Sequence, residues 1–553
     1  MRLLISLLLG IAIHTVAAQN PATNQTWINS GKVSARITSA GIHADSLGGF
    51  VLGNDAPGLP PKNLLGHLAP WIGGLDPAGN LKLACEMDDP TVSDWQQGIR
   101  GVTGSGKVWK VSREQISEHI SDFQDNGVID NPIPAIFAWP APGNPHSTLL
   151  NEFAIPPQYR PLPHFYDHNN DGIYDPYDGD YPTVGHLASF SNLVPEQLVC
   201  APFFDNGLHA LSASVKEISM NGMLTAFTLD CNEKEFAQNT IFFAYSFSYE
   251  DIERADSAYF GLFADFELGY PHDDYLGCSM PKKAAVYCYN ADTLNDLVAG
   301  QNPAMISINS FRGPLDTFGN LIELSHAIPI LHSNEFPAAV RRPHLPIGFY
   351  RYLSGHWRDG SPLLAGGIGY NSGGEKVKFA FPGHPSNADG WSEISASNPL
   401  SDREMIISYG PLTIKPGAVN EVFFSISALT EKGPSAQLQR LDEFRLLQEH
   451  LLENNPIGQP LCASTATKEH TKQGISVFPN PASSRLIIRT DISGAITLTL
   501  FNAFGSKVLE KTELTSEGKI IERSIANLPA GLYILRWEAA DGRHGTHKII
   551  VQH

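Results

Sequence analysis

The sequence predicts a mainly β protein, in which a large β-rich, sandwich-like region precedes a small C-terminal Ig-like β-sandwich. Three observations support this fold class. Glycine and proline are frequent, at 49 and 40 of 553 residues, which indicates many turns. Charged residues make up 17% of the chain, below the roughly 25% of typical soluble domains. The apolar runs are short and bounded by turn residues, as β-strands are.

Five segments follow one another along the chain. We expect a signal peptide at 1–18, a β-rich region at 19–430, an amphipathic helix at 431–456, a linker at 457–473 and the small sandwich at 474–553. The first segment joins a basic start to an apolar run and ends in small residues, which is typical of a secretory signal peptide. Because no later apolar run is long enough to cross a bilayer, we expect no transmembrane segment.

Strand-like runs dominate the region 19–430. The clearest lie at 240–248, 258–263 and 421–427, and glycine and proline turns such as 410–417 separate them. They favour one large β-rich region or two packed sandwiches. Apolar residues then recur at helical spacing between Pro434 and Pro456, which predicts one amphipathic helix that packs on the β-rich region. These residues are Leu438, Leu441, Phe444, Leu447 and Leu451.

Charge and cysteine content limit the environment and the partners. The net charge of −19 argues against a nucleic-acid partner, since phosphate binding needs a positive surface, and it favours the attraction of cations. The six cysteines can form up to three disulfides in an oxidising compartment, or they can be buried free thiols. Cys278 and Cys288 are close enough in sequence to join a hairpin. The cysteines are Cys85, Cys200, Cys231, Cys278, Cys288 and Cys462.

The segment 474–553 alternates apolar and polar residues in short runs. Ile496, Leu498 and Leu500 alternate with threonines, and a second run at 532–537 does the same. About seven such strands form a small β-sandwich. The blocks VFPNPASSRLIIR, LFNAFGSKVLE, IANLPAGLYILRW and HKIIVQ resemble, in order, the C-terminal sorting domain of Bacteroidetes proteins exported by the type IX secretion system. The resemblance implies that the type IX secretion machinery is a partner of this segment and that the protein is secreted or displayed on the outer-membrane cell surface.

Blocks within 40–430 resemble large secreted proteins that often carry the same sorting domain. They include LAPWIGGLDPAGNL at 68–81 and ISYGPLTIKPG at 407–417. This resemblance implies location and class, and it brings no activity with it.

The stretch DHNNDGIYDPYDGD at 167–180, within the segment 165–182, concentrates aspartates around a glycine. Counted from Asp167, oxygen ligands fall at the first, third, fifth, ninth and twelfth positions, and the seventh offers a backbone carbonyl. Ca²⁺ takes six to eight oxygen ligands from a wrapped loop of this kind, with glycine at the sharp turn. The six ligands are Asp167, Asn169, Asp171, Ile173, Asp175 and Asp178.

This loop departs from an EF-hand because Asp178 replaces the bidentate glutamate and prolines replace the flanking helices. Its spacing resembles the calcium loops of thrombospondin type 3 repeats, which implies a structural Ca²⁺. A solvated acidic turn is the alternative, since Asp, Asn and Gly favour turns in any case. Asp180 is expected to serve the same ion or to support its ligands.

A second acidic group lies at 265–274. Asp265 and Glu267 share a face if this segment is a strand, and Asp273 and Asp274 follow a turn. These four carboxylates can hold a second cation or stay solvated. Two of them can also act as an acid and base pair, as in glycoside hydrolysis.

Motifs for common catalytic centres are absent from the sequence, including G-x-S-x-G, H-E-x-x-H and the phosphate-binding glycine patterns. We therefore expect a calcium-braced adhesion, binding or structural component of the cell surface, whose ligand is a glycan or a surface protein. The alternative is a secreted hydrolase of polysaccharide or protein that uses carboxylates around Asp265 and Glu267.

Overall fold

The chain forms two compact units, Met1–Cys462 and Ala463–His553. The computed structural model describes residues 23–38, 40–53, 61–87, 93–156, 158–185, 193–205, 215–229, 235–270, 272–279, 285–291, 303–454, 475–478, 482–490, 494–502, 507–515, 519–540 and 544–552. The predicted signal peptide at 1–18 and the predicted linker at 457–473 lie outside these ranges; so do Cys231 and Cys462.

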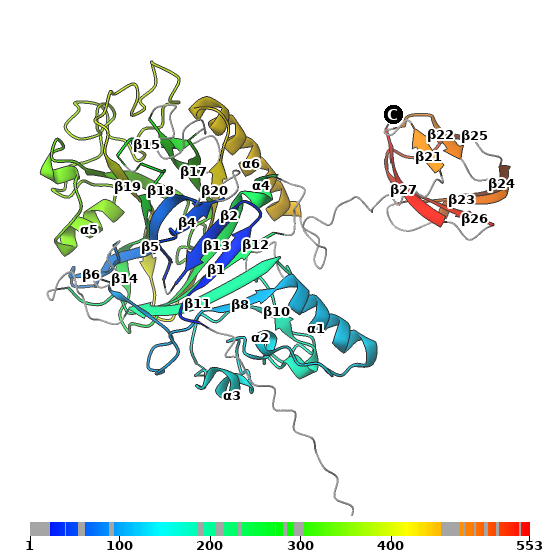
Figure 1. The fold of residues 1–553 in the computed structure, drawn as a ribbon, viewed down its shortest axis with the longest axis horizontal. Helices are drawn as coiled ribbons and strands as arrows, with labels where there is room; N and C mark the ends of the chain where they lie inside the picture. The colour runs from blue at the N-terminus through cyan, green and yellow to red at the C-terminus, as the bar shows by residue number, and fades with distance from the viewer. Residues whose placement is uncertain are drawn as a thin grey trace, which may run out of the picture. The chain divides into compact units, whose positions relative to one another are not determined.

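The larger unit is built on two antiparallel sheets, and the first has the strand order β1-β2-β3-β5-β14-β19-β18 (Figure 1). Strand β4 pairs with β2 and β5, and β6 pairs with β5. The strands are β1 (Thr26–Ser30), β2 (Val33–Ile37), β3 (Ile42–His43), β4 (Phe50–Leu52), β5 (Lys62–Leu75), β6 (Leu81–Ala84), β14 (Ala255–Phe266), β18 (Leu324–His332) and β19 (Asp402–Ile414).

The second sheet has the order β15-β16-β17-β20-β13-β12-β11-β7, and β8 pairs with β11. Its strands are β7 (Trp95–Gln97), β8 (Trp109–Ser112), β11 (Gln197–Asp205), β12 (Met220–Thr228), β13 (Thr240–Tyr249), β15 (Asp274–Ser279), β16 (Ala285–Asn290), β17 (Met305–Arg312) and β20 (Val419–Leu429). The three strand-like runs predicted at 240–248, 258–263 and 421–427 fall within β13, β14 and β20.

The inner faces of the two sheets share one apolar core. Phe260 of β14 lies against Phe247 of β13, with ring centroids 5.2 Å apart. The hydroxyl of Tyr245 on β13 donates to the carbonyl oxygen of Ala40, beside the first sheet, at 2.6 Å. Buried side chains from both sheets belong to this single cluster. The β-rich region is therefore one large sandwich.

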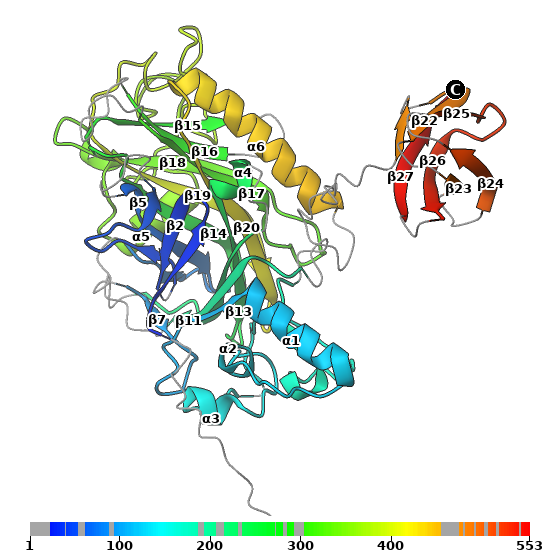
Figure 2. The same cartoon turned by 45° about the vertical axis from the view of Figure 1, so that its right-hand side comes forward.

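Helices cover the outer faces of both sheets (Figures 1 and 2). Helix α6 packs on β17 and β20, and α1 packs on α2 and β8. Helix α5 packs on the first sheet, where Phe349 lies 4.8 Å from Trp71 of β5 between ring centroids. The helices are α1 (Arg113–Asn126), α2 (Pro134–Phe137), α3 (Ser147–Asn151), α4 (Glu235–Gln238), α5 (Pro346–Leu353) and α6 (Pro434–Asn454), with short 3-10 turns η2 (Pro176–Asp178) and η3 (Ala338–Val340).

Helix α6 confirms the predicted amphipathic helix, with one difference on its buried face. Leu438, Leu441 and Phe444 are buried as expected, but Leu447 is 47% exposed. Gln448 is buried in its place, because its amide reaches the hydroxyls of Ser425 at 3.0 Å and Ser427 at 3.3 Å. The inward face thus continues through a glutamine, which the apolar pattern could not indicate.

Besides the predicted helix, α1 and α5 are also regular helices. Helix α1 begins with a capping box in which the Ser112 hydroxyl accepts a hydrogen bond from the Gln115 backbone N–H, and the Gln115 side chain accepts one from the Ser112 backbone N–H. This S-x-x-Q pattern is a sequence signal for a helix start. The predicted turn at 410–417 was misplaced, because β19 continues to Ile414. The pairing of β19 with β14 contains a register shift near Ala258.

The cysteines that the structure describes are free and buried: Cys85, Cys200, Cys278 and Cys288. Cys278 pairs with Val286 and Cys288 with Leu276, so backbone hydrogen bonds join the β15–β16 hairpin without a disulfide. No described helix combines the length and apolar character that crossing a membrane requires.

The smaller unit is a β-sandwich of seven described strands. A three-stranded sheet, β21-β22-β25, and a four-stranded sheet, β24-β23-β26-β27, enclose Ile496, Leu498 and Trp537. The alternating pattern in the sequence is thereby confirmed. The strands are β21 (Ile475–Phe478), β22 (Arg485–Thr490), β23 (Gly494–Asn502), β24 (Lys507–Thr515), β25 (Lys519–Ser524), β26 (Gly531–Ala539) and β27 (His544–Val551).

Candidate functional site

The acidic loop at 167–180 is closed at its base by a two-stranded pairing. Strand β9 (Phe165–Tyr166) pairs with β10 (Tyr181–Pro182), and the rings of Tyr166 and Tyr181 stack with centroids 4.7 Å apart. The loop therefore leaves the domain and returns to it at one point, which is the geometry that lets a short segment wrap around an ion.

Two buried residues anchor this loop: Tyr174 holds it to the helical layer, and Asp180 joins its two halves. The hydroxyl of Tyr174 donates to the carbonyl oxygen of Ile136 in α2 at 2.7 Å, and its ring is fully buried. Asp180 is also fully buried; its carboxylate accepts hydrogen bonds from the backbone N–H groups of His168 at 2.8 Å and Asp175 at 3.0 Å. Burial raises the pKa of Asp180 to about 6, and the charges of Asp167 and Asp171 add to the increase. Asp180 thus joins the two halves of the loop.

Four of the predicted ligands converge on the exposed side of the loop. The amide nitrogen of Asn169 lies 3.1 Å from Oδ2 of Asp171 and 3.3 Å from Oδ2 of Asp178. Asp167 accepts hydrogen bonds from the backbone N–H groups of Asp171 at 3.2 Å and Gly172 at 2.8 Å. A cation between these carboxylates would take the place of the Asn169 amide nitrogen. A half turn of this amide would direct its oxygen at the cation, because the oxygen and the nitrogen of an Asn amide are assigned from their hydrogen-bond partners. Calcium binding by this loop stays a prediction, because in the described residues Asp167, Asp171 and Asp178 do not form a set of three carboxylates whose oxygens all lie within 4.8 Å of one another.

The other two predicted ligands are placed differently. Asp175 accepts a hydrogen bond from the Tyr177 backbone at 3.0 Å, and its Oδ1 lies 3.2 Å from Nε2 of His146. The backbone N–H of Ile173 donates to Asp171 at 2.8 Å, and its side chain is exposed. The turn itself is as predicted, because Gly172 has a φ of 78°, in the left-handed region that favours glycine.

A cavity of about 640 Å³ adjoins this loop. Asp167 and Gly172 line it, together with Arg312 of β17 and Glu421 of β20. Oε1 of Glu421 is buried without a hydrogen-bond partner, and its Oε2 accepts from Ser246 at 3.2 Å. Burial raises the pKa of Glu421, and the nearby Arg312 opposes the increase. The cavity thus presents a buried acceptor and cationic groups side by side.

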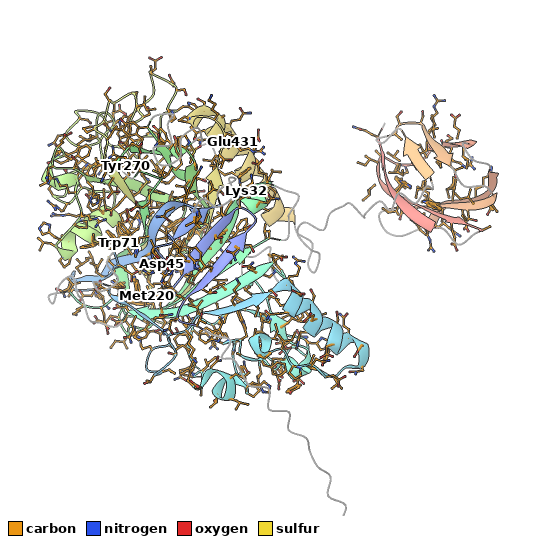
Figure 3. The ribbon with its side chains drawn as sticks, in the orientation of Figure 1. Lys32, Asp45, Trp71, Met220, Tyr270 and Glu431 are labelled. Carbon is orange, nitrogen blue, oxygen red and sulfur yellow. The ribbon has the colours of Figure 1, made fainter. Side chains whose placement is uncertain are left out.

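Asp265, from the second predicted acidic group, belongs to a row of polar residues across the first sheet. His43, His67, Asp265 and Glu404 pair in register on β3, β5, β14 and β19. Residues opposite each other in antiparallel strands point to the same face, with Cβ atoms about 4.5–5.5 Å apart. His67 alternates with Ala69 and Trp71 along β5, so this row shares the face of Trp71, which is labelled in Figure 3 and packs against Phe349 of α5.

This row is buried, and all its members are ionisable. Asp265 is 5% exposed and Glu404 is fully buried. Burial raises the pKa of Asp265, and the carboxylates of Glu404, Asp402 and Glu267 raise it further. Arg342 forms an ion pair with Glu404, and Nε2 of His332 lies 2.7 Å from the other Glu404 oxygen. Arginine and histidine thus balance the acidic end of the row.

Asp273 and Asp274 lie at the start of β15, on the second sheet. Asp274 is fully buried and accepts a hydrogen bond from the Leu268 backbone at 3.2 Å. Burial raises its pKa, and Asp273 and Glu267 add to the increase. In the described part of the chain, the set of three His, Cys, Asp or Glu side chains whose ligand atoms all lie within 4.8 Å of one another is His43, His67 and Glu86. The structure therefore does not gather Asp265, Glu267, Asp273 and Asp274 into one such set.

The sequence reasoning missed His43, His67, Glu86 and Glu404. They are single polar residues inside or beside apolar strands, and only the strand register brings them together. One signal was present, since a glutamate beside apolar strands is almost never fully buried without a partner.

Comparison with known families concerns the smaller unit. Residues 476–552 match the model of the secretion system C-terminal sorting domain. This segment is a type IX sorting domain. The protein is therefore a secreted or cell-surface protein, and the sorting domain is its point of interaction with the type IX secretion machinery. No curated protein matches the chain.

Three solved structures show limited likeness. An immunoglobulin-like β-sandwich protein of the DUF3244 family from Bacteroides vulgatus ATCC 8482 is 25% identical, over 14% of this chain and 84% of that one, with a TM-score of 0.13. A polysaccharide lyase is 10% identical, over 62% of this chain and 36% of the lyase, with a TM-score of 0.19. The BSP domain of a biofilm-associated protein is 10% identical, over 96% of this chain and 82% of that one, with a TM-score of 0.13. At these scores the likenesses carry no inference about function.

Proposed function

We propose that the protein is a calcium-braced binding component of the cell surface, and that its ligand is a glycan held in the cavity beside the acidic loop. One observation carries this proposal: Asp167 and Gly172 belong to the acidic loop and also line the cavity, so the loop forms part of the cavity wall. An ion wrapped by the loop would fix the position of that wall. Calcium binding and ligand binding are then coupled.

The chemistry of the cavity suits a sugar with an anionic group. Glu421 offers a buried oxygen that lacks a donor, which a sugar hydroxyl can supply. Arg160 and Arg312 also line the cavity, and guanidinium groups bind carboxylates in a bidentate manner. A uronic acid unit combines both features, so we take an acidic glycan as the ligand class.

The position of Asp265 favours binding over the alternative of hydrolysis. A glycoside hydrolase needs two carboxyl groups that face the substrate. Asp265 and Glu404 lie opposite each other, but both are buried, and neither lines the cavity of about 640 Å³. A substrate would have to displace α5 or the segment around Arg342 to reach them.

Titration calorimetry tests this proposal with a panel of uronic-acid and neutral oligosaccharides and the purified mature chain. We expect binding of acidic oligosaccharides in the presence of calcium and weaker binding in EGTA. Glu421→Gln should reduce the affinity at least tenfold, while Glu323→Gln, a matched change at an exposed glutamate, should leave it unchanged. Equal affinity of both variants and the wild type would contradict the cavity assignment.

A further inference from the structure

Three side chains from three separate elements meet inside the first sheet of the larger unit. His43 lies at the end of β3, His67 lies within β5, and Glu86 follows β6. The imidazole rings of the two histidines are 4.4 Å apart between centroids and nearly perpendicular, at 69°. Nε2 of both histidines faces the same Glu86 oxygen, with His67 at 3.5 Å and His43 in direct contact. The three ligand atoms are within 4.8 Å of one another.

One of these nitrogens is left without a hydrogen-bond partner. His67 is 2% exposed, and its Nε2 neither donates nor accepts a hydrogen bond within the described residues. A buried polar atom in this state costs about 1–3 kcal/mol. Burial lowers the pKa of His67, and the charges of His43 and Arg342 lower it further. A neutral imidazole can direct a lone pair at Nε2 towards Glu86.

The surrounding contacts hold each of the three side chains in place. Nδ1 of His43 contacts the hydroxyl of Thr38, and the second oxygen of Glu86 accepts a hydrogen bond from Ser93. The backbone carbonyl of Glu86 accepts from the indole of Trp71, which is labelled in Figure 3. Supporting contacts of this kind orient the ligands of metal sites in proteins, because they fix the tautomer of the imidazole and the direction of the carboxylate.

We propose that His43, His67 and Glu86 bind a divalent transition-metal ion, with zinc as the expected occupant. Two imidazole nitrogens and one carboxylate oxygen are the donor set that such ions prefer, whereas Ca²⁺ selects oxygen ligands. A tetrahedral site with metal–ligand bonds of about 2.0–2.2 Å places its ligands about 3.3–3.6 Å apart. The separation of 3.5 Å between His67 and Glu86 agrees with this value. The ion would supply the missing partner of His67.

The burial of the three ligands indicates a structural role for the ion. His43 is 8% exposed and Glu86 is 1% exposed, so substrate-sized molecules have no access to them. The ion would join β3, β5 and the segment after β6 near one end of the first sheet. This site is independent of the acidic loop, because it uses different residues and a different donor type.

Metal analysis of the purified full-length mature chain tests the proposal. Expression without a histidine tag in zinc-supplemented medium, followed by mass spectrometry of the metal content, should give close to one zinc per chain. Glu86→Gln and His67→Gln should each lower this content at least tenfold. His119→Gln is the matched control, because His119 is equally buried but contacts the backbone carbonyl of Asp180 at 2.9 Å; it should retain the metal.

Cobalt substitution gives a second readout that needs no variant. The stripped wild-type chain should take up one Co²⁺ and show the intense visible absorption of tetrahedral coordination. Asp171→Asn should leave this spectrum unchanged, so failure of the calcium proposal and failure of the zinc proposal are distinguishable. A wild-type chain that retains less than about a tenth of an equivalent of metal and shows no cobalt spectrum would overturn the assignment.

Discussion

Arg403 and Glu393 form a bidentate ion pair in which neither side chain is exposed to solvent. Nη2 of Arg403 lies 2.9 Å from Oε2 of Glu393, and its Nε lies 3.1 Å from Oε1. Glu393 also accepts a hydrogen bond from the backbone N–H of Leu276 at 2.8 Å. Because Arg403 belongs to β19 and Leu276 to β15, the pair joins the first sheet to the second.

Glu393→Gln should destabilise the larger unit strongly. Removal of one partner leaves the Arg403 guanidinium buried and uncompensated, which typically costs about 3–5 kcal/mol. Chemical denaturation followed by tryptophan fluorescence measures the effect. Glu443→Gln is the control, since Glu443 pairs with Arg440 at the surface of α6 and such pairs contribute about 0–1 kcal/mol. A similar loss in the free energy of unfolding in both variants would show that burial does not set the contribution of the Arg403–Glu393 pair.

Two adjacent residues of α6 should respond very differently to alanine. Gln448→Ala removes the buried amide that contacts the hydroxyls of Thr240, Ser425 and Ser427, so we expect a loss of about 1–3 kcal/mol in the free energy of unfolding. Leu447→Ala should change stability by about 0.5 kcal/mol or less, because this side chain is exposed. The reverse order of the two effects would show that α6 presents the opposite face to the sheet.

The stability of the larger unit should fall in mildly acidic solution partly because of His326. Burial lowers the pKa of His326 to about 4, and Lys378, His356 and Lys376 add to the decrease. His326 takes up a proton near pH 6.5 in the unfolded chain and near pH 4 in the folded chain. Protonation therefore favours the unfolded chain between these values, so the free energy of unfolding is highest above pH 6.5 and falls as the pH drops to about 4. Because the ring is partly exposed, we expect a loss of about 1–2 kcal/mol.

His326→Phe should remove this part of the pH dependence. Unfolding curves at pH 7 and pH 4.5 measure the difference for the variant and the wild type. His384→Phe, at an exposed histidine, should keep the wild-type dependence. An equal loss of stability on acidification in the wild type and in His326→Phe would assign the effect to other groups.

Deletion of 474–553 should stop export at the outer membrane. The sorting domain at 476–552 is what the type IX machinery recognises, so the truncated chain should accumulate in the periplasm. Cell fractionation and immunoblotting measure its location. In the complementary experiment, residues 474–553 fused to a periplasmic reporter should carry the reporter out of the cell. Normal surface delivery of the truncated chain would contradict the role of this domain.

The sequence alone predicted those features that depend on neighbouring residues. The apolar run in β13, the alternation in β23, the helical spacing in α6 and the glycine at Gly172 are local patterns, and the structure places each as expected. The acidic loop was recognisable for the same reason, because its predicted ligands lie within one short segment. Its closure by β9 and β10 and its anchoring by Tyr174 required the fold.

The polar row and the proposed zinc site could not be predicted in this way. His43, His67 and Glu86 are far enough apart in sequence that only the pairing of β3 with β5 and the return of the chain after β6 bring them together. Glu393 and Arg403 are close in sequence, but their burial depends on the packing of both sheets. Isolated polar residues in apolar strands give no spacing that a sequence pattern can use.

The binding of calcium by the acidic loop is the central claim, and calorimetric titration of Ca²⁺ into the metal-free mature chain tests it most directly. We expect one ion per chain, with a dissociation constant of about 10⁻⁴–10⁻³ M as in other extracellular modules. Asp171→Asn should abolish the binding, while Asp389→Asn, at an exposed aspartate outside the loop, should leave it intact. If the wild type binds no calcium and melts at the same temperature in calcium and in EGTA, the loop is a solvated turn and the account is wrong.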